Sequence, residues 1–397
     1  MTLDKGDRKV LMVLESNYPT EGGGGAEGQL RTICRYLKEH DIPVSIIVPM
    51  RQDGAQCEHD SIDGVSVWRI PYPKLRKVGG FVMLARLMIA LFKRCRDYHV
   101  IHVHMAHNMA SVSSAVGWLL GKTVIVKITG SLEMADGVLD SGRRSPGVVI
   151  KRWLLRHATY FQATSHEIRN RLIENGIDAN RVRVIPNAVD LARFAAMTKS
   201  RDASTGRPMT MIYVGRLSEE KAPDVLLEAW IDAIPVDSRA QLMLIGDGAM
   251  RASLEQKITQ AGRAGQVVLH GPQEDIGPFL AQADVAVLPS LYEGLSNALL
   301  EYMASGLPVL GTRVSGTVDF IEDGQCGWLV EPGDKEQLAG RLRTLMSMDR
   351  ARLREMGEMA CQRVASRARI ERVIGQLAEL YEIDADLLKH KPQGKLI

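Results

Sequence analysis

The chain has 397 residues, more than one ordinary hydrophobic core contains, so we expect two domains of about 200 residues each. Its hydrophobic fraction of 45% and charged fraction of 24% are those of a soluble globular protein. The net charge of +3 indicates no partner by itself. The five cysteines form no C-x-x-C pair, so we expect a reducing compartment and neither a disulfide framework nor a zinc site. We also expect no secretory signal and no membrane span, since the first ten residues are polar and no apolar run reaches the roughly 18–20 residues that a span requires.

The first half of the chain alternates segments typical of strands and helices. Lys9–Glu15 is a short apolar run that predicts a buried strand, and a glycine-rich loop follows at Thr20–Gly28. Gln29–His40 carries apolar residues at helical spacing, and Val44–Val48 predicts the next strand. This order is a βαβ unit, which implies a parallel sheet. Further strands are expected at Val65–Ile70, Val100–Val103, Val124–Ile128, Tyr160–Ala163 and Val182–Ile185.

A second block of the same kind follows a polar segment. Met197–Pro208 has neither an apolar period nor strand propensity, and we assign it as a linker between domains. Helices are expected at Pro223–Asp232 and Met250–Ala261, and the pattern from Asp349 to Leu388 is helical. Strands are expected at Met209–Val214, Gln241–Ile245, Val267–Leu269, Val285–Leu288, Pro308–Gly311 and Gly327–Val330.

The two blocks predict an α/β protein with two doubly wound, Rossmann-like domains that face each other across a cleft. We place the first domain at residues 1–196 and the second at 197–375. Residues 376–397 are expected to form a helix and tail that pack back on the first domain. Ligands of such sheets bind beyond the carboxyl ends of the strands, so the loops at those ends are the first candidates for a site.

The richest of these loops is SLYEGLSNALLEYMASGLP, which follows the predicted strand Val285–Leu288. Glu293 lies in the loop, and Glu301 lies on a predicted helix that Ser296 or Asn297 caps and that runs to about Ala304. The helix start favours an anion such as phosphate, and Glu301 can accept hydrogen bonds from ribose hydroxyls. The backbone donors would come from Gly294, Leu295 and Ser296. Taken alone, the two carboxylates are equally explained as a loop residue and a solvated helix residue.

Two cations follow the first strand of the second domain in the segment VGRLSEEK. Arg216 presents a planar fork of donors, and Lys221 presents a compact positive charge. Together they can neutralise a diphosphate as negative charge develops on it. A random Arg/Lys pair is more often two solvated surface cations, but the position at a strand end favours a site.

The glycine run EGGGGAE opens the first helix. Consecutive glycines allow close approach of the backbone to a ligand, and a helix start favours an anion. The run lacks the acidic partner of an NAD site and the Lys-Ser/Thr of a P-loop. A plain flexible loop is the alternative.

These motifs, in this order, resemble family 4 of the retaining glycosyltransferases, which have the GT-B fold. The resemblance extends over nearly the whole chain, and Glu293 and Glu301 match the E-x7-E pair of the family. The segments that carry it are GGGGAEGQLRTICRYL, HVHMAH, ATSHEIRNRL, VIPNAVDLARF, VGRLSEEKAPDVLLEAW, LIGDGAMRASLE and ADVAVLPSLYEGLSNALLEYMASGLPVLGT.

The resemblance implies a role for each matching position. The catalytic group would be Arg216 and Lys221 on the donor diphosphate and Glu293 on the transferred sugar. Glu301 would hold the ribose. Backbone contacts to the donor would come from Gly24, Gly25, Gly294, Leu295 and Ser296. The resemblance further implies retention of anomeric configuration, no metal and no cofactor beyond the nucleotide sugar, with the leaving phosphate helping to deprotonate the acceptor.

Three departures from the family pattern concern the sugar. Many members carry a His where this chain has Thr129, and a hydroxyl is no general base, which favours deprotonation by the substrate. Ala188 replaces the usual Gly in PNAVD, and Asp319 stands where Glu is usual. Because of these departures, the sequence does not identify the transferred sugar.

Three histidines alternate along or just after a predicted strand. We expect His102 to be buried and His104 or His107 to face the cleft, so His104, His107 and Thr129 are candidates for contact with the acceptor or sugar. A metal site needs a further ligand, and we predict none. The D-x-D triplet at Asp384 and Asp386 is interpreted as solvated tail.

Two basic segments of the first domain suggest a surface partner. Lys74–Arg96 mixes apolar and basic residues without any acidic one, and a second basic run extends from Arg143 to Arg156. A basic amphipathic helix can bind an anionic lipid surface, whereas an ordinary core helix with a wet basic face is the alternative. Nucleic acid is not expected, because interleaved stacking aromatics are missing from the basic run.

The sequence therefore predicts a cytoplasmic hexosyltransferase, peripheral at the inner face of the plasma membrane. It would use a UDP- or GDP-sugar and a saccharide or lipid-linked saccharide acceptor in cell-surface or exopolysaccharide synthesis. A nucleotide-sugar epimerase on the same scaffold is the alternative. A non-catalytic sugar-nucleotide binder would normally lose some of the four charged residues, and Arg216, Lys221, Glu293 and Glu301 are all present.

Overall fold

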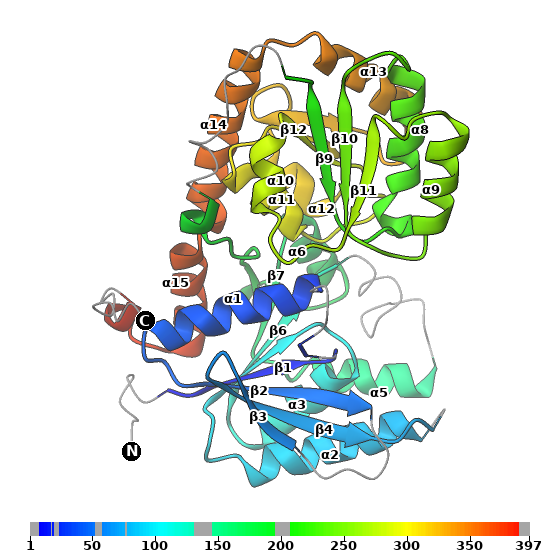
Figure 1. The fold of residues 1–397 in the computed structure, drawn as a ribbon. Helices are drawn as coiled ribbons and strands as arrows, with labels where there is room; N and C mark the ends of the chain where they lie inside the picture. The colour runs from blue at the N-terminus through cyan, green and yellow to red at the C-terminus, as the bar shows by residue number, and fades with distance from the viewer. Residues whose placement is uncertain are drawn as a thin grey trace. The chain divides into compact units, whose positions relative to one another are not determined.

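The structure is a computed structural model that describes residues 8–16, 18–19, 24–51, 58–75, 78–130, 145–194 and 207–388. The chain forms two compact units (Figure 1). Unit 1 consists of Met1–Ala188 and Ile370–Ile397, and unit 2 consists of Val189–Arg369. Each unit is a doubly wound α/β domain, as predicted.

The divisions between the units come earlier in the chain than the boundaries expected at 197 and 376. Val189 and Arg369 pair in a parallel bridge, and the Val189 N–H donates to the Ala368 carbonyl at 2.9 Å. Backbone pairing thus closes unit 2 on itself at both of its ends. Most of the predicted linker lies outside the described residues.

Unit 1 has an eight-stranded sheet of order β3-β4-β2-β1-β5-β6-β7-β8. All neighbouring strands are parallel except β3 and β4, which are antiparallel. The strands are β1 (Val10–Leu14), β2 (Val44–Arg51), β3 (Glu58–Ile62), β4 (Val65–Tyr72), β5 (Val100–His104), β6 (Thr123–Ile128), β7 (Tyr160–Ala163) and β8 (Val182–Val184).

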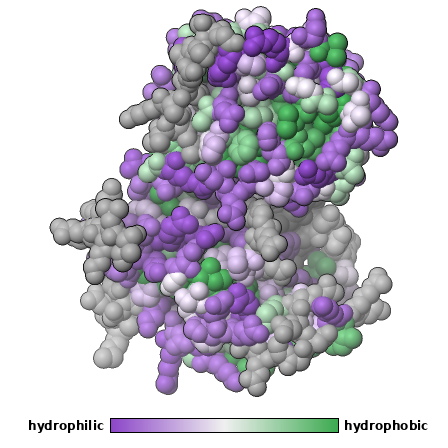
Figure 2. Space-filling model, in the orientation of Figure 1, coloured by the Kyte–Doolittle hydropathy of each residue, from purple (hydrophilic) through white to green (hydrophobic). Residues whose placement is uncertain are grey.

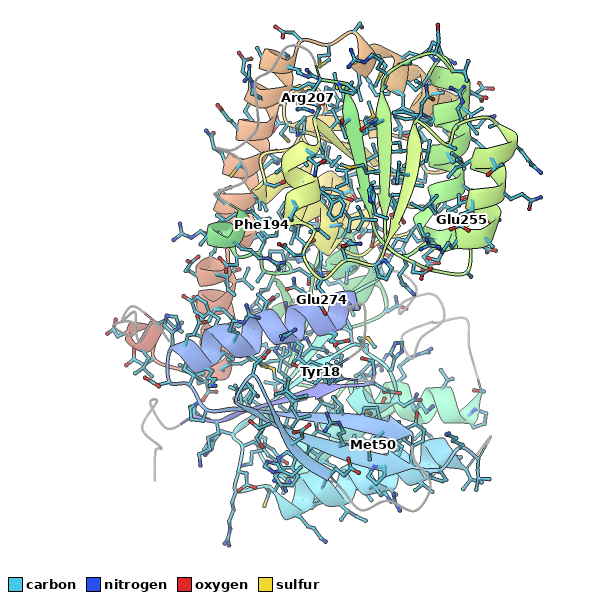
Figure 3. The ribbon with its side chains drawn as sticks, viewed as in Figure 1. Tyr18, Met50, Phe194, Arg207, Glu255 and Glu274 are labelled. Atoms are coloured by element: carbon cyan, nitrogen blue, oxygen red, sulfur yellow. The ribbon has the colours of Figure 1, made fainter. Side chains whose placement is uncertain are left out.

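Helices cover both faces of this sheet, with α1 on one side and the α2, α3 and α5 layer on the other (Figure 1). One core packs against α1 and α15, and Tyr18 belongs to it (Figure 3). The second core packs against the layer of α2, α3 and α5. The helices of unit 1 are α1 (Gly25–Glu39), α2 (Gly79–Lys93), α3 (Asn108–Leu119), α5 (Pro146–Leu155), α6 (His166–Glu174), α15 (Ile370–Tyr381) and the 3-10 turns at Ala179–Arg181 and Ala385–Leu388.

Unit 2 has a six-stranded, fully parallel sheet of order β11-β10-β9-β12-β13-β14. Its strands are β9 (Thr210–Val214), β10 (Gln241–Ile245), β11 (Val267–Gly271), β12 (Val285–Leu288), β13 (Val309–Thr312) and β14 (Gly327–Val330). Its helices are α8 (Pro223–Ala233), α9 (Arg251–Gln260), α10 (Gly277–Gln282), α11 (Asn297–Ala304), α12 (Ser315–Phe320), α13 (Lys335–Met346), α14 (Arg350–Ala368) and a 3-10 turn, η3 (Glu219–Lys221). Phe194 packs into one of the two cores that flank this sheet (Figure 3).

Ion pairs anchor the amino-terminal edge of the unit 2 sheet. The buried carboxylate of Asp284, just before β12, accepts hydrogen bonds from Arg207 (3.0 Å) and from the Thr210 N–H (2.9 Å) (Figure 3). Arg350 from the start of α14 adds a contact at 3.4 Å. Charge at this edge is therefore structural, which leaves the carboxyl edge for ligands.

Each strand predicted from an apolar run is present, with its ends shifted by a few residues at most. The exception is β3, which the sequence did not predict. Its residues, EHDSI, are mostly exposed, so no apolar pattern marks the strand. It forms because β4 offers a free edge for antiparallel pairing, from Glu58 opposite Arg69 to Ile62 opposite Val65.

Candidate active site

Three neighbouring loops gather at the carboxyl edge of the unit 2 sheet, after β10, β9 and β12. The Leu291 N–H, after β12, donates to the Glu220 carbonyl in the loop after β9 (2.9 Å). The Leu217 N–H donates to the Asp247 carbonyl in the loop after β10 (2.9 Å). Backbone hydrogen bonds therefore join the three loops into one framework that holds their side chains in place.

Lys221 and Glu293, which the sequence placed in a common site, form an ion pair between two of these loops. The Lys221 side chain is 18% exposed and the Glu293 side chain 9%. The Ser290 hydroxyl lies 3.3 Å from the same carboxylate oxygen and donates to it. A half-buried pair of this kind is better defined than a solvent-exposed one, because less water screens it.

Arg216 lies in the same loop as Lys221 but reaches into solvent, with 74% of its side chain exposed. Its guanidinium pairs with Glu220 at 2.9 Å. Burial opposes ionisation of Glu220, but hydrogen bonds and the Arg216 charge outweigh it and lower the pKa of Glu220. Each predicted phosphate-binding cation is therefore paired with a carboxylate.

The loop Gly294–Ser296 leads into α11, which begins at Asn297 and ends at Ala304, as predicted. Ser296 is one of the two residues that the sequence predicted to cap this helix. This residue occupies the N-cap position with an extended backbone, but its hydroxyl makes no capping hydrogen bond. The Gly316 N–H donates to the Gly294 carbonyl (2.6 Å), and a Cβ at Gly316 would lie 2.4 Å from that oxygen. A glycine at 316 is thus required for the loop to lie where it does.

Glu301 lies on α11 and is largely buried. Burial raises the pKa of its carboxyl to about 7, and the Arg193 guanidinium opposes this increase. The next residue, Tyr302, is buried and accepts a hydrogen bond from the Val214 N–H at the end of β9. Tyr302 therefore ties α11 to β9, close to the loop that carries Arg216.

The loop after β10 belongs to this framework, and the sequence analysis assigned it no role. Gly246 has φ +135°, and a Cβ there would lie 2.0 Å from the Gly215 carbonyl oxygen. A Cβ at Gly248 would lie 2.4 Å from the Leu217 carbonyl oxygen. The glycines of GDG therefore let this loop pack directly on the backbone around Arg216. The G-x-G spacing directly after a strand was the available signal.

In unit 1, four candidates lie in loops at the carboxyl edge of the sheet. Gly24 and Gly25 are exposed at the start of α1, with Gly24 in the N-cap position. His107 precedes α3 after β5, and Thr129 follows β6. Both are partly exposed. The beginning of the glycine run, residues 21–23, lies outside the described residues.

His104 does not fit its predicted role. It is fully buried at the end of β5, and burial lowers its pKa well below the usual value. Neither ring nitrogen has a hydrogen-bond partner within the part of the chain that the structure describes. His102 is buried on the same side of the strand, as predicted, and its Nδ1 lies 2.6 Å from the Tyr381 hydroxyl. A side chain enclosed like that of His104 does not meet an acceptor.

Among the described residues, no three His, Cys, Asp or Glu side chains are arranged to hold a metal ion. The D-x-D triplet lies at the end of unit 1, where Asp384 and Asp386 are exposed. The Asp386 N–H donates to the Asp384 carboxylate at 3.0 Å, which is a local turn contact.

Two doubly wound units, one with paired cations and carboxylates at the carboxyl edge of a parallel sheet, are the arrangement expected of a GT-B glycosyltransferase. The family comparison agrees. A model described as "Glycosyltransferase Family 4" matches residues 23–193, and one described as "Glycosyl transferases group 1" matches residues 208–348. The chain belongs to this group 1/family 4 of glycosyltransferases.

Curated relatives are similar over different lengths. The chain is 34% identical over 216 residues to the lipopolysaccharide core biosynthesis glycosyltransferase LpsE of Rhizobium meliloti, across 53% of this chain and 58% of that protein. It is 25% identical over 390 residues to N-acetyl-alpha-D-glucosaminyl L-malate synthase of Bacillus anthracis, across 96% of this chain and 98% of that protein. The match to LpsE thus spans little more than half of its length.

Solved structures share the fold. HepE of Anabaena in complex with UDP superposes with a TM-score of 0.72 at 21% identity, over 94% of this chain and 98% of HepE. Sucrose-phosphate synthase of Thermosynechococcus elongatus superposes with a TM-score of 0.74 at 20% identity, over 94% and 98% of the two chains. At these identities the similarity to the solved structures shows a shared fold and carries no statement about activity. Within the described ranges, no helix has the length and apolar character that crossing a membrane requires.

Proposed function

We propose that this protein transfers a hexose from a UDP- or GDP-sugar to a saccharide or lipid-linked saccharide, with retention of configuration and without a metal ion. The proposed setting is cell-surface polysaccharide synthesis at the cytoplasmic side of the membrane. LpsE, WcaL of Salmonella typhimurium and AmsK of Erwinia amylovora carry names from lipopolysaccharide, colanic acid and amylovoran synthesis, which supports this setting. HepE binds UDP and UDP-glucose, which supports a uridine donor.

The observation that carries the proposal is the ion pair between Lys221 and Glu293 beside the exposed Arg216. The two cations are paired with Glu220 and Glu293. A bound diphosphate offers them a stronger, doubly charged partner. Lys221 would then exchange Glu293 for phosphate oxygen. The released carboxylate would be free to accept hydrogen bonds from hydroxyls of the sugar.

The chemistry follows from that exchange of partners. As the bond from the anomeric carbon to the phosphate oxygen breaks, negative charge develops on the diphosphate, and Lys221 and Arg216 stabilise it there. Glu301 would accept hydrogen bonds from the ribose, and the start of α11 would face a phosphate. A hydroxyl at Thr129 is no general base, so the departing phosphate would take the acceptor proton. The glycine pair of unit 1, Gly24 and Gly25, would offer backbone N–H groups to an anion.

A nucleotide-sugar epimerase is not retained as an alternative. None of the relatives and structures named above is an epimerase. Epimerisation would also need no acceptor, so incubation of the donor alone would yield an isomer.

The test begins with a thermal-shift panel of UDP-, GDP- and ADP-sugars, because a ligand that binds only the folded chain raises its melting temperature. The best binder is then incubated, with EDTA, with a lipid-linked saccharide fraction, and both nucleoside diphosphate release and the anomeric configuration of the product are measured. We expect release that depends on the acceptor. No stabilisation by any nucleotide sugar would reject the donor site.

A further inference from the structure

The layer formed by α2, α3 and α5 differs from the rest of the surface of unit 1. In this layer α2 contacts α3, and α3 contacts α5 (Figure 1). The inner sides of these helices pack on the sheet through one hydrophobic core. Their outer sides would be expected to be polar, because no other helix or strand that the structure describes in unit 1 covers them.

The outer side of the layer is instead hydrophobic. Of the sixteen large hydrophobic side chains that are exposed among the described residues, eleven lie on α2, α3, α5 or the turn before α2. Phe81 is 77% exposed, and Met88 and Phe92 follow on the same helix. Isolated exposed hydrophobic residues are ordinary, but a concentration on adjacent helices marks an interaction surface.

The helix on the opposite face of the sheet provides an internal comparison. The exposed residues of α1 after its two leading glycines are Gly28, Arg31, Arg35, Lys38 and Glu39. Figure 2 shows that the surface over α1 is mostly hydrophilic. Both faces of one sheet are covered by helices, yet the exposed large hydrophobic side chains of the described residues in unit 1 are concentrated on one of them.

Two tryptophans on this surface are held in place by ring contacts with a histidine between them. Trp118 at the end of α3 and Trp153 on α5 flank His157, with ring centroids 4.5 Å and 4.8 Å from the imidazole. Both indoles are more than half exposed. Tryptophan is the side chain that most often occupies the boundary between lipid headgroups and hydrocarbon, since its ring is both apolar and a hydrogen-bond donor.

The three helices of this layer carry charge of one sign, and the nearest exposed carboxylate that the structure describes after α2, Asp97, pairs with Arg94. The helices α2, α3 and α5 contain no acidic residue. Lys93, Arg96 and Arg156 are exposed at their ends and form no ion pair with any residue that the structure describes. Hydrophobic side chains bordered by unpaired cations complement an anionic lipid surface.

We propose that the outer side of α2, α3 and α5 docks unit 1 on an anionic lipid bilayer, with Phe81, Phe92 and the two tryptophans entering the headgroup region. A second copy of the chain fits less well, because a symmetric contact would bring like charges together. The proposal concerns a surface distant in sequence from Arg216 and Lys221, so it stands apart from the transfer reaction, although a lipid-linked acceptor would explain it.

The test is flotation of the full chain with vesicles of phosphatidylcholine, with and without about one third phosphatidylglycerol, at low and high salt. We expect binding only to the anionic vesicles, weakened by salt. Phe81→Ser with Phe92→Ser, and separately Lys93→Glu with Arg96→Glu, should each reduce binding at least tenfold. The matched controls in unit 2, Val236→Ser with Val268→Ser and Arg239→Glu with Arg354→Glu, should bind like the unmodified chain.

Two further measurements separate the docking proposal from the proposed transfer reaction. Each variant should keep the thermal shift with a nucleotide sugar, and Lys221→Ala should keep vesicle binding, so failure of the docking proposal is separable from failure of the transfer reaction. Equal binding to neutral vesicles, or unchanged binding by both surface variants, would overturn the proposal. Concentration-dependent dimers in sedimentation that the Phe81/Phe92 variant abolishes, without vesicle binding, would assign the surface to a second copy instead.

Discussion

The carboxyl edges of the two sheets share an architecture but differ in the burial of their titratable side chains, since unit 1 encloses His104 and, beside it, Lys127 of β6. In unit 2 the loops after β9 and β12 hold Lys221 and Glu293 as a half-buried pair and leave Arg216 in solvent. In unit 1 the last residues of β5 include the fully buried His104, whose burial keeps its imidazole neutral. The doubly wound fold thus fixes where a site lies, and the side chains at the strand ends decide whether that site binds an anion.

The largest loss of turnover is expected when Lys221 is removed from the carboxyl edge of unit 2. Lys221→Ala removes the cation that would meet the leaving diphosphate, so turnover should fall by roughly 10²-fold or more. The control is Lys257→Ala, which also removes a lysine paired with a glutamate, Glu228, but on exposed helices of the same unit. Turnover is measured as nucleoside diphosphate release at saturating donor. If both variants retained full turnover, Lys221 would have no place in the site.

Removal of the Arg216 side chain should reduce catalytic activity less, because this side chain is exposed to water, which screens its charge. Arg216→Ala should reduce kcat/KM by about tenfold or more, within the range that a single phosphate donor contributes. Arg251→Ala is the matched control, because Arg251 also pairs with a glutamate four residues later at 2.9 Å. Equal losses in the two variants would indicate a general effect of surface charge.

Much of this edge could be predicted from the sequence, for a physical reason. The strands β9 and β12 are apolar runs bounded by polar residues, and a buried parallel strand requires that pattern. The positions of Arg216 and Glu293 then follow from chain order alone, since parallel strands end at one edge.

Other features depend on tertiary contacts, which the local sequence pattern does not predict. The polar strand β3 exists only through its pairing with β4, and Ser296 occupies an N-cap position without capping. The burial that raises the pKa of Glu301 arises from packing around α11. The burial of His104 was accessible in principle, because His102 and His104 lie two residues apart on one strand and therefore share a face.

The burial of Glu301 predicts that both the stability of the chain and its affinity for a nucleotide sugar depend on pH. Its carboxyl has a pKa raised from 4.5 to about 7, so the folded chain binds this proton more tightly than the unfolded chain does. The free energy of unfolding contributed by this group is therefore highest below about pH 4.5 and falls as the pH rises through 7. Glu301→Gln cannot ionise and should melt a few degrees higher than the unmodified chain at pH 8, corresponding to on the order of 1–3 kcal/mol.

The same substitution should weaken binding, because an ionised carboxylate is the better acceptor for ribose hydroxyls. The affinity of the unmodified chain for its nucleotide sugar should fall several-fold from pH 8 to pH 6, whereas Glu301→Gln should bind weakly with little pH dependence. Melting curves and calorimetric titrations at both pH values measure the two effects. A variant that loses thermal stability and affinity together at pH 8 would assign Glu301 a structural role.

The smallest expected effect concerns the buried histidines of β5 in unit 1. The Tyr381 hydroxyl, from α15, makes a buried hydrogen bond with His102 at 2.6 Å, and Tyr381→Phe removes it while the ring stays packed. The free energy of unfolding should fall by about 1 kcal/mol, which lowers the melting temperature by about 2–4 °C. Tyr292→Phe, at an exposed tyrosine of unit 2, should change neither quantity. Burial lowers the pKa of His102 to about 3, so the imidazole is neutral throughout the neutral range and the loss should be equal at pH 6 and pH 8. A loss that appeared at only one of these pH values would mean that His102 titrates between them.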